Sequence, residues 1–156
     1  MLPNPEVIKA LSDAYSPCKF FGDCKEAKWK PEEGHIPRGF LGATGSLDEV
    51  EAVFVFAEPG HPLINEIYPK SLDPRGYIRL TSDFAFSCFD EELDVMHTNV
   101  KHILNQTWPS LHFAEQLRKV WITETRLCSI DDEIGEIPIR TRDICSSYYL
   151  KKQLLI

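Results

Sequence analysis

The sequence predicts an α/β domain in which a parallel β-sheet is flanked by helices. Two apolar runs, 52–57 and 120–123, have the β-branched and aromatic composition of buried strands. Stretches with helical periodicity precede, separate and follow them, and such an alternation favours a parallel sheet. At 156 residues the chain is long enough to bury one core, so we expect a single domain over 1–156.

The first half of the chain is expected to hold one helix, a long loop and one strand. The helix starts at Asn4, an N-cap followed by proline and an acidic residue, and its apolar spacing ends before Pro17. The stretch 18–46 has no sustained period and is rich in glycine, proline and charge. We expect an ordered loop there, and long loops in compact domains usually have a functional reason. The strand at 52–57 then runs into a sharp turn at 58–62.

The second half is expected to continue the alternation. An irregular stretch follows the turn, and a further strand near 78–80 is an alternative within it. Apolar spacing over 93–104 predicts a helix, and Ser110 could cap a short one. After the strand at 120–123, a final helix is expected from 141 to the end. Two strands are too few for a free-standing sheet, so strands have been missed or the chain is a fragment.

The composition is that of a soluble globular protein, with 43% hydrophobic and 26% charged residues. No apolar run is long enough to span a membrane, and the N-terminus lacks the features of a signal peptide. We therefore expect a cytoplasmic protein with no membrane contact. The formal charge of −7 argues against a general polyanion binder. Basic residues cluster near both ends of the chain, so the net charge does not exclude a local basic face.

The cysteines are candidate metal ligands because a reducing compartment disfavours structural disulfides. Cys18 and Cys24 bracket a short glycine-containing loop, which could turn two thiolates toward one centre. Cys128 and Cys145 follow the second strand, and Cys88 stands alone between aromatic residues. Four thiolates can hold an iron–sulfur cluster or a structural zinc ion. By spacing alone, small buried apolar side chains remain the favoured interpretation.

Three stretches resemble the iron–sulfur (family 4-like) uracil-DNA glycosylases. The segment 120–128 (VWITETRLC) is similar to the strand of that family that is followed by a cluster-binding cysteine. The run 145–153 (CSSYYLKKQ) resembles its helix with the next cluster cysteine. Upstream, 55–60 (VFAEPG) is similar to its first active-site turn. The stretches occur in the order of the family and cover roughly the whole chain.

The resemblance implies a uracil-DNA-glycosylase-like fold with a [4Fe–4S] cluster. Its four ligands would be Cys18, Cys24, Cys128 and Cys145, with zinc as the alternative metal, while Cys88 is expected to be a buried apolar residue. The implied function is hydrolysis of a base–sugar bond in damaged DNA, single- or double-stranded. The alternative is a non-catalytic iron–sulfur module of the same fold that binds DNA or serves as an accessory.

The same resemblance gives four candidate site residues. Glu58 would be the catalytic carboxylate, and Glu124 stands where the family has the asparagine that reads uracil. An ionised glutamate can only accept hydrogen bonds, so Glu124 would favour a donor-rich ligand edge or would have to be protonated. Phe86 is a candidate for stacking on a flipped base, and His61 for binding substrate. Each has a structural alternative, as a turn residue or as part of the core.

The chain also departs from the family pattern. Three extra residues separate Cys18 from Cys24, and an ungapped alignment puts Ala57 at the catalytic position with Glu58 one residue later. The family's remaining strands and its histidine-containing loop would follow Ile156. We therefore expect 1–156 to be an incomplete domain, with a protein partner as one source of the missing strands.

Overall fold

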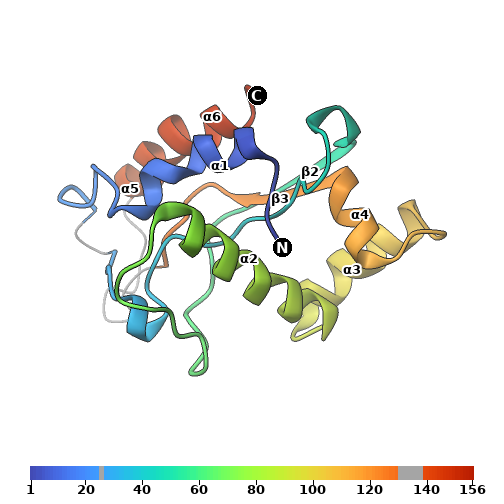
Figure 1. Cartoon of the computed structure of the whole chain (residues 1–156), viewed down its shortest axis with the longest axis horizontal. Helices are drawn as coiled ribbons and strands as arrows, with labels where there is room; N and C mark the ends of the chain where they lie inside the picture. Colours follow the sequence, from blue (N-terminus) through green and yellow to red (C-terminus); the bar gives the residue numbers. More distant parts are fainter. Residues whose placement is uncertain (25–26, 130–138) are drawn as a thin grey trace.

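The computed structural model describes residues 1–24, 27–129 and 139–156. The described residues form a small sheet of three strands, in the order β1 (Leu41–Gly42), β3 (Val120–Glu124) and β2 (Ala52–Phe56). Helices lie on both sides of this sheet (Figure 1). The prediction of a sheet flanked by helices in an α/β domain is therefore confirmed.

The sheet is mixed, and the prediction of a purely parallel sheet was wrong. β2 runs parallel to β3 along its whole length, whereas β1 is antiparallel to β3, with Leu41 opposite Ile122. β1 lies inside the stretch that was expected to be a loop, and two residues are too few to show an alternating pattern. Its Gly42 has a φ of +98°, and a Cβ there would lie 2.1 Å from the carbonyl oxygen of Val120. Only glycine fits so close to the neighbouring strand.

β2 is an edge strand and is buried on one face only. Phe54 and Phe56 pack against a core cluster, while Val53 and Val55 are each 44% exposed. The expectation of a fully buried strand was therefore wrong for β2. A continuous apolar run does not distinguish a strand covered on both faces from one covered on a single face.

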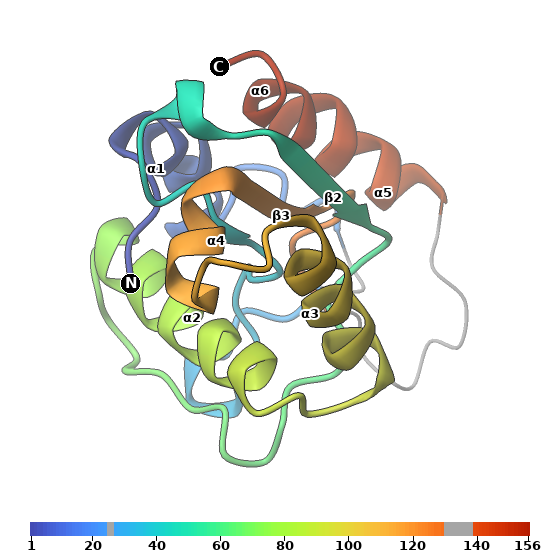
Figure 2. The ribbon, with the colours of Figure 1, turned by 90° about the vertical axis from the view of Figure 1, so that its right-hand side faces the viewer.

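The helices are confined to six ranges of the described residues. They are α1 (Pro5–Leu11), α2 (Pro74–Asp90), α3 (Val95–Thr107), α4 (Phe113–Lys119), α5 (Ile139–Cys145) and α6 (Lys151–Gln153), with a π-helical turn at Ser146–Leu150 joining the last two. Three short 3₁₀ turns lie at Ser12–Tyr15, Pro31–Glu33 and Leu47–Glu49. Figure 2 shows α1, α5 and α6 on one side of the sheet and α2, α3 and α4 on the other.

The predicted start of the first helix is confirmed by its capping contact, and the later helix starts are shifted by one or a few residues. The Asn4 side chain accepts a hydrogen bond from the Glu6 N–H at the start of α1. The helix predicted over 93–104 is α3, capped by Asp94. The short helix α4 starts at His112 rather than at Ser110. The final helix is observed, and the residues just before it, 130–138, lie outside the described part of the chain.

The largest difference from the sequence prediction is α2. This 17-residue helix occupies a stretch expected to be irregular, with an alternative strand near 78–80. It begins at Asp73, whose carboxylate accepts a hydrogen bond from the Gly76 N–H at 2.6 Å, and Pro74 occupies the first turn. Tyr77, Ile78 and Thr81 form part of its buried face. The Asp-Pro start was the sequence signal for this helix.

Two core clusters lie on opposite faces of the sheet. Trp121 belongs to the cluster beneath α1 and the C-terminal helices, while its neighbour Ile122 belongs to the cluster with α3 and α4. Successive strand residues point to opposite faces, so both sides of β3 are covered. Among the described residues, no helix combines the length and apolar character needed to cross a membrane.

Candidate functional site

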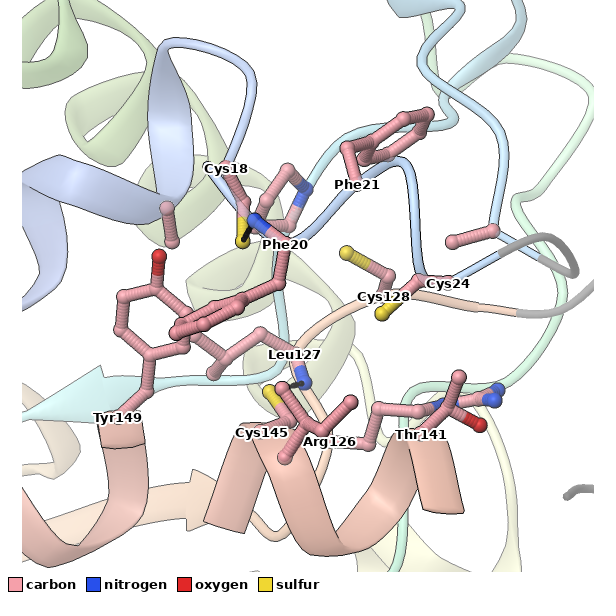
Figure 3. Close-up of a pocket in the computed structure, with 14 residues that line it drawn as sticks. Cys18, Phe20, Phe21, Cys24, Arg126, Leu127, Cys128, Thr141, Cys145 and Tyr149 are labelled. Atoms are coloured by element: carbon pink, nitrogen blue, oxygen red, sulfur yellow. Dashed lines mark hydrogen bonds between the residues drawn. The ribbon is translucent and has the colours of Figure 1, made fainter. Parts of the chain in front are cut away.

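The four cysteines predicted as ligands line a single cavity. Cys18 and Cys24 reach it from the loop after the first 3₁₀ turn, Cys128 from the loop after β3, and Cys145 from the end of α5 (Figure 3). The cavity has a volume of about 30 Å³. A single water molecule needs about 10–15 Å³ on the same measure. The structure thus brings three distant segments together around a space larger than one water molecule.

The surroundings of these thiols are mostly apolar. Phe20, Phe21 and Leu127 line the cavity beside them. Burial, followed by the neighbouring cysteines, raises the pKa of the Cys128 thiol far above its usual value. Burial likewise raises the pKa of Cys145 to about 11. At neutral pH these two thiols are therefore protonated in the absence of a bound cation, and metal binding would release their protons.

Hydrogen-bond donors point at the sulfur atoms. The backbone N–H of Phe20 donates to Cys18 Sγ at 3.3 Å, and that of Leu127 donates to Cys145 Sγ at 3.4 Å. The buried hydroxyl of Tyr149 faces the Cys18 side of the cavity (Figure 3), and burial, together with its contact with Cys18, raises its pKa. Donors of this kind stabilise thiolates and tune iron–sulfur clusters.

The sulfur atoms surround a shared space rather than converging on one point (Figure 3). Within the described parts of the chain, no three His, Cys, Asp or Glu side chains are grouped tightly enough to hold a single metal ion. Cys88 lies apart from the four and lines a second cavity, where burial raises its pKa. The arrangement therefore places Cys88 in a different cavity from the other four cysteines.

The second cavity lies at the carboxyl ends of β2 and β3. It has a volume of about 190 Å³ and is bounded by the turn after β2, the loop before β1, and helices α2 and α3. Ligands of open α/β sheets commonly bind at this edge. Pockets for drug-sized ligands measure roughly 300–1,000 Å³. This cavity therefore has room for a small ring rather than for a larger molecule.

Glu124 and Glu66 are buried carboxyl groups in the lining of this cavity, and Glu124 is the one without an ion-pair partner among the described residues. It is 9% exposed, and its Oε2 atom has no hydrogen-bond partner among the described residues. Gly39, with a φ of +81°, lies so close that a Cβ there would be 2.4 Å from Glu124 Cδ. Burial raises the pKa of Glu124 to about 9; Glu58 acts in the same direction, and Arg38 opposes it. At pH 7 the carboxyl group is therefore neutral and can both donate and accept a hydrogen bond.

Glu58 lies beside this cavity rather than in its lining. Its Oε2 atom is 2.8 Å from Nη2 of Arg126, a side chain that is 4% exposed and also lines the cysteine cavity. The backbone N–H of Arg126 donates to the carbonyl oxygen of Ala57 at 3.3 Å. Arg126 thus links the candidate catalytic carboxylate to the cysteines. Sequence reasoning missed it, because its partner is far away in the chain.

A second ion pair fixes the turn that carries Glu58. Arg38 pairs with the buried Glu66 and donates to the carbonyl oxygen of Gly60. The Tyr68 hydroxyl donates to the other oxygen of Glu66 at 2.8 Å. These contacts hold the loop before β1 against the turn after β2, and they too were not predicted.

The remaining substrate candidates divide between the cavity and the core. His61 lines the cavity, with its ring centroid 5.3 Å from that of His35. Phe86 does not belong to the lining: it stacks on Phe113 at 5.3 Å between centroids, in the core. Phe84, two residues earlier on α2, lines the cavity instead. Aromatic stacking on a ligand would therefore involve Phe84 or another aromatic residue of the lining rather than Phe86.

Comparisons of the chain with protein families, with curated proteins and with solved structures found no match. The family and the function suggested by the sequence motifs therefore depend on those motifs and on the geometry described above. The geometry contributes a cysteine-lined cavity, a ligand-sized cavity at the sheet edge, and a buried arginine between them.

Proposed function

We propose that this chain is an iron–sulfur protein with a uracil-DNA-glycosylase-like fold. Its cluster ligands are Cys18, Cys24, Cys128 and Cys145. The observation that supports the proposal most directly is that these four cysteines, from three separate segments, line one cavity while Cys88 does not. Four cysteines are the usual ligand set of a [4Fe–4S] cluster.

Four cysteine thiolates can hold a cluster or a single zinc ion. The resemblance to the iron–sulfur glycosylases favours the cluster, and the four cysteines border a common space. Two N–H···S contacts and the buried Arg126 supply the donors and the positive charge that a cluster with four thiolates attracts. When bound, such a cluster would tie three chain segments together and could carry an electron.

The second cavity is the proposed site for a nucleobase. The neutral carboxyl group of Glu124 can donate to one atom of a base edge and accept from its neighbour, as an asparagine amide does. Gly39 leaves space for this group, and the Arg38–Glu66 pair holds the adjoining turn. Glu58, oriented by Arg126, could hold a water molecule or stabilise positive charge on the sugar. Base–sugar hydrolysis is the activity that these groups support.

A non-catalytic iron–sulfur DNA-binding module of the same fold is the second candidate. One observation favours it: Glu58 does not line the cavity, and one of its oxygens is already paired with Arg126. A carboxylate occupied in this way is poorly placed to activate water.

The metal content tests the proposal. Protein purified without oxygen should be brown and contain about four irons and four sulfides per chain. One tightly bound zinc ion would replace the proposal with the zinc alternative, and a protein without either metal would defeat it.

Excision assays separate the two candidate functions. We expect no measurable uracil release by 1–156 from single-stranded or duplex DNA, because Glu58 is paired with Arg126 and does not line the cavity. DNA binding without excision would support the accessory module. Excision that is lost in Glu58→Gln would instead establish the glycosylase, and excision that survives it would remove Glu58 from the mechanism.

A further inference from the structure

Arg126 lies between the cysteine cavity and the candidate catalytic carboxylate. It is two residues before Cys128, it lines the same cavity, and its guanidinium group is 2.8 Å from Glu58 Oε2. The side chain is 4% exposed, so water does little to screen its charge. One buried cation is therefore shared by two sites.

The charge of Arg126 reaches the thiols as well as Glu58. Its side chain lines the cavity that the four cysteines border, so its charge acts on whatever this cavity holds. Its Nε atom has no hydrogen-bond partner among the described residues. A buried guanidinium group needs compensating negative charge, and Glu58 supplies only part of what its donors can bind. The side chain that carries this unpaired donor also lines the cysteine cavity.

We propose that Arg126 is the counter-charge of the cysteine-held centre and divides its interaction between that centre and Glu58. This inference depends on the proposed iron–sulfur cluster. A cluster bound by four thiolates carries a net negative charge, which a buried arginine stabilises. Arg126 is a positioning residue: it acts on Glu58 through their ion pair and on the cluster through its charge. The charge of the centre and the placement of Glu58 are then coupled.

The coupling has a direction. Addition of one electron to the cluster by an external reductant increases its negative charge, which strengthens its attraction for Arg126 at the expense of the ion pair with Glu58. Conversely, removal of the Glu58 charge leaves Arg126 free to stabilise the reduced cluster. Coupling free energies are reciprocal. The effect of the cluster on Glu58 and the effect of Glu58 on the cluster can therefore both be measured as changes in the midpoint potential of the cluster.

The midpoint potential of the cluster, titrated with dithionite and followed by absorbance, tests this coupling. Arg126→Gln should shift the potential to a more negative value. Arg126→Lys keeps the positive charge, so its potential should lie close to that of the wild type. Glu58→Gln should shift the potential to a more positive value. That positive shift should be smaller when Arg126→Gln is also present, because the part transmitted through Arg126 is then absent. Arg142→Gln, an exposed arginine on α5, is the matched control and should leave the potential unchanged.

Each outcome decides the question. Potentials that do not change in Arg126→Gln and Glu58→Gln, or shifts that are simply additive, overturn the proposal while leaving the cluster established. A wild-type protein with no cluster overturns the proposed function and this inference with it. If Arg126→Gln cannot retain its cluster, Arg126→Lys and Glu58→Gln still measure the coupling.

Discussion

Glu124 carries a buried carboxyl group, and the two described arginines that act to lower its pKa are already paired with other carboxylates. Arg38 pairs with Glu66 and Arg126 with Glu58. Burial therefore dominates, and the pKa of Glu124 is raised from 4.5 to about 9. Between these two pH values the unfolded chain has released this proton while the folded chain retains it. The free energy of unfolding consequently falls as the pH rises through this window.

Glu124→Gln should remove this pH dependence, because glutamine has the same shape and does not titrate. The single group contributes a slope of up to about 1.4 kcal/mol per pH unit. We expect the variant to gain stability relative to the wild type between pH 5 and pH 8.5, measured by urea unfolding. Glu91→Gln, an exposed carboxylate, is the control and should not change the slope. Equal slopes in the wild type and Glu124→Gln would show that Glu124 is ionised in the folded protein.

The sequence supplied some of the site residues and could not supply others. The cysteines, Glu58 and Glu124 belong to short sequence patterns around strand ends and a helix. Such patterns can be recognised in a single sequence without the structure. Arg126 and Gly39 matter through contacts with residues far away in the chain. Phe86 and Phe84 sit two residues apart on α2, and only the direction of each side chain separates the core from the cavity.

Among the elements, β3 was predicted because it is a continuous apolar run that is buried throughout, and α3 because its apolar residues recur at helical spacing. The start of α2 was missed because apolar, aromatic and glycine residues alternate there without a clear helical stripe. What fixes the helix is the Asp73 cap, followed by burial of Tyr77 and Ile78 against α1 and its neighbours. A cap is a single residue. Whether a helix follows it depends on tertiary contacts that cannot be read from the sequence.

Asp73→Ala should therefore destabilise the protein by about 1 kcal/mol, the usual cost of losing an N-cap. The first-turn N–H of Gly76 would lose its acceptor. Chemical denaturation at pH 7 measures the change. Ser71→Ala, two residues earlier and exposed, should cost less than about 0.5 kcal/mol. An equal effect of the two substitutions would mean that the cap does not stabilise α2.

At the scale of the whole molecule, the proposed cluster joins the N-terminal loop, the loop after β3 and the C-terminal helix. Cys128→Ser should release the metal and lower the unfolding temperature, because ligand binding energy is folding energy in such sites. Iron analysis and thermal unfolding report the two effects. Cys88→Ser, in the other cavity, should retain the metal. Metal loss in Cys88→Ser with retention in Cys128→Ser would show that the four ligands were wrongly chosen.

The position of β2 at the edge of the sheet affects how the protein behaves at high concentration. Among the described residues this strand pairs on one side only, and Val53 and Val55 are half exposed. An unpaired strand edge beside apolar side chains is a template for a strand from another chain, including an identical one. The average mass from sedimentation should therefore rise with protein concentration. Val55→Lys should suppress this rise, since a lysine on an edge strand opposes pairing between copies.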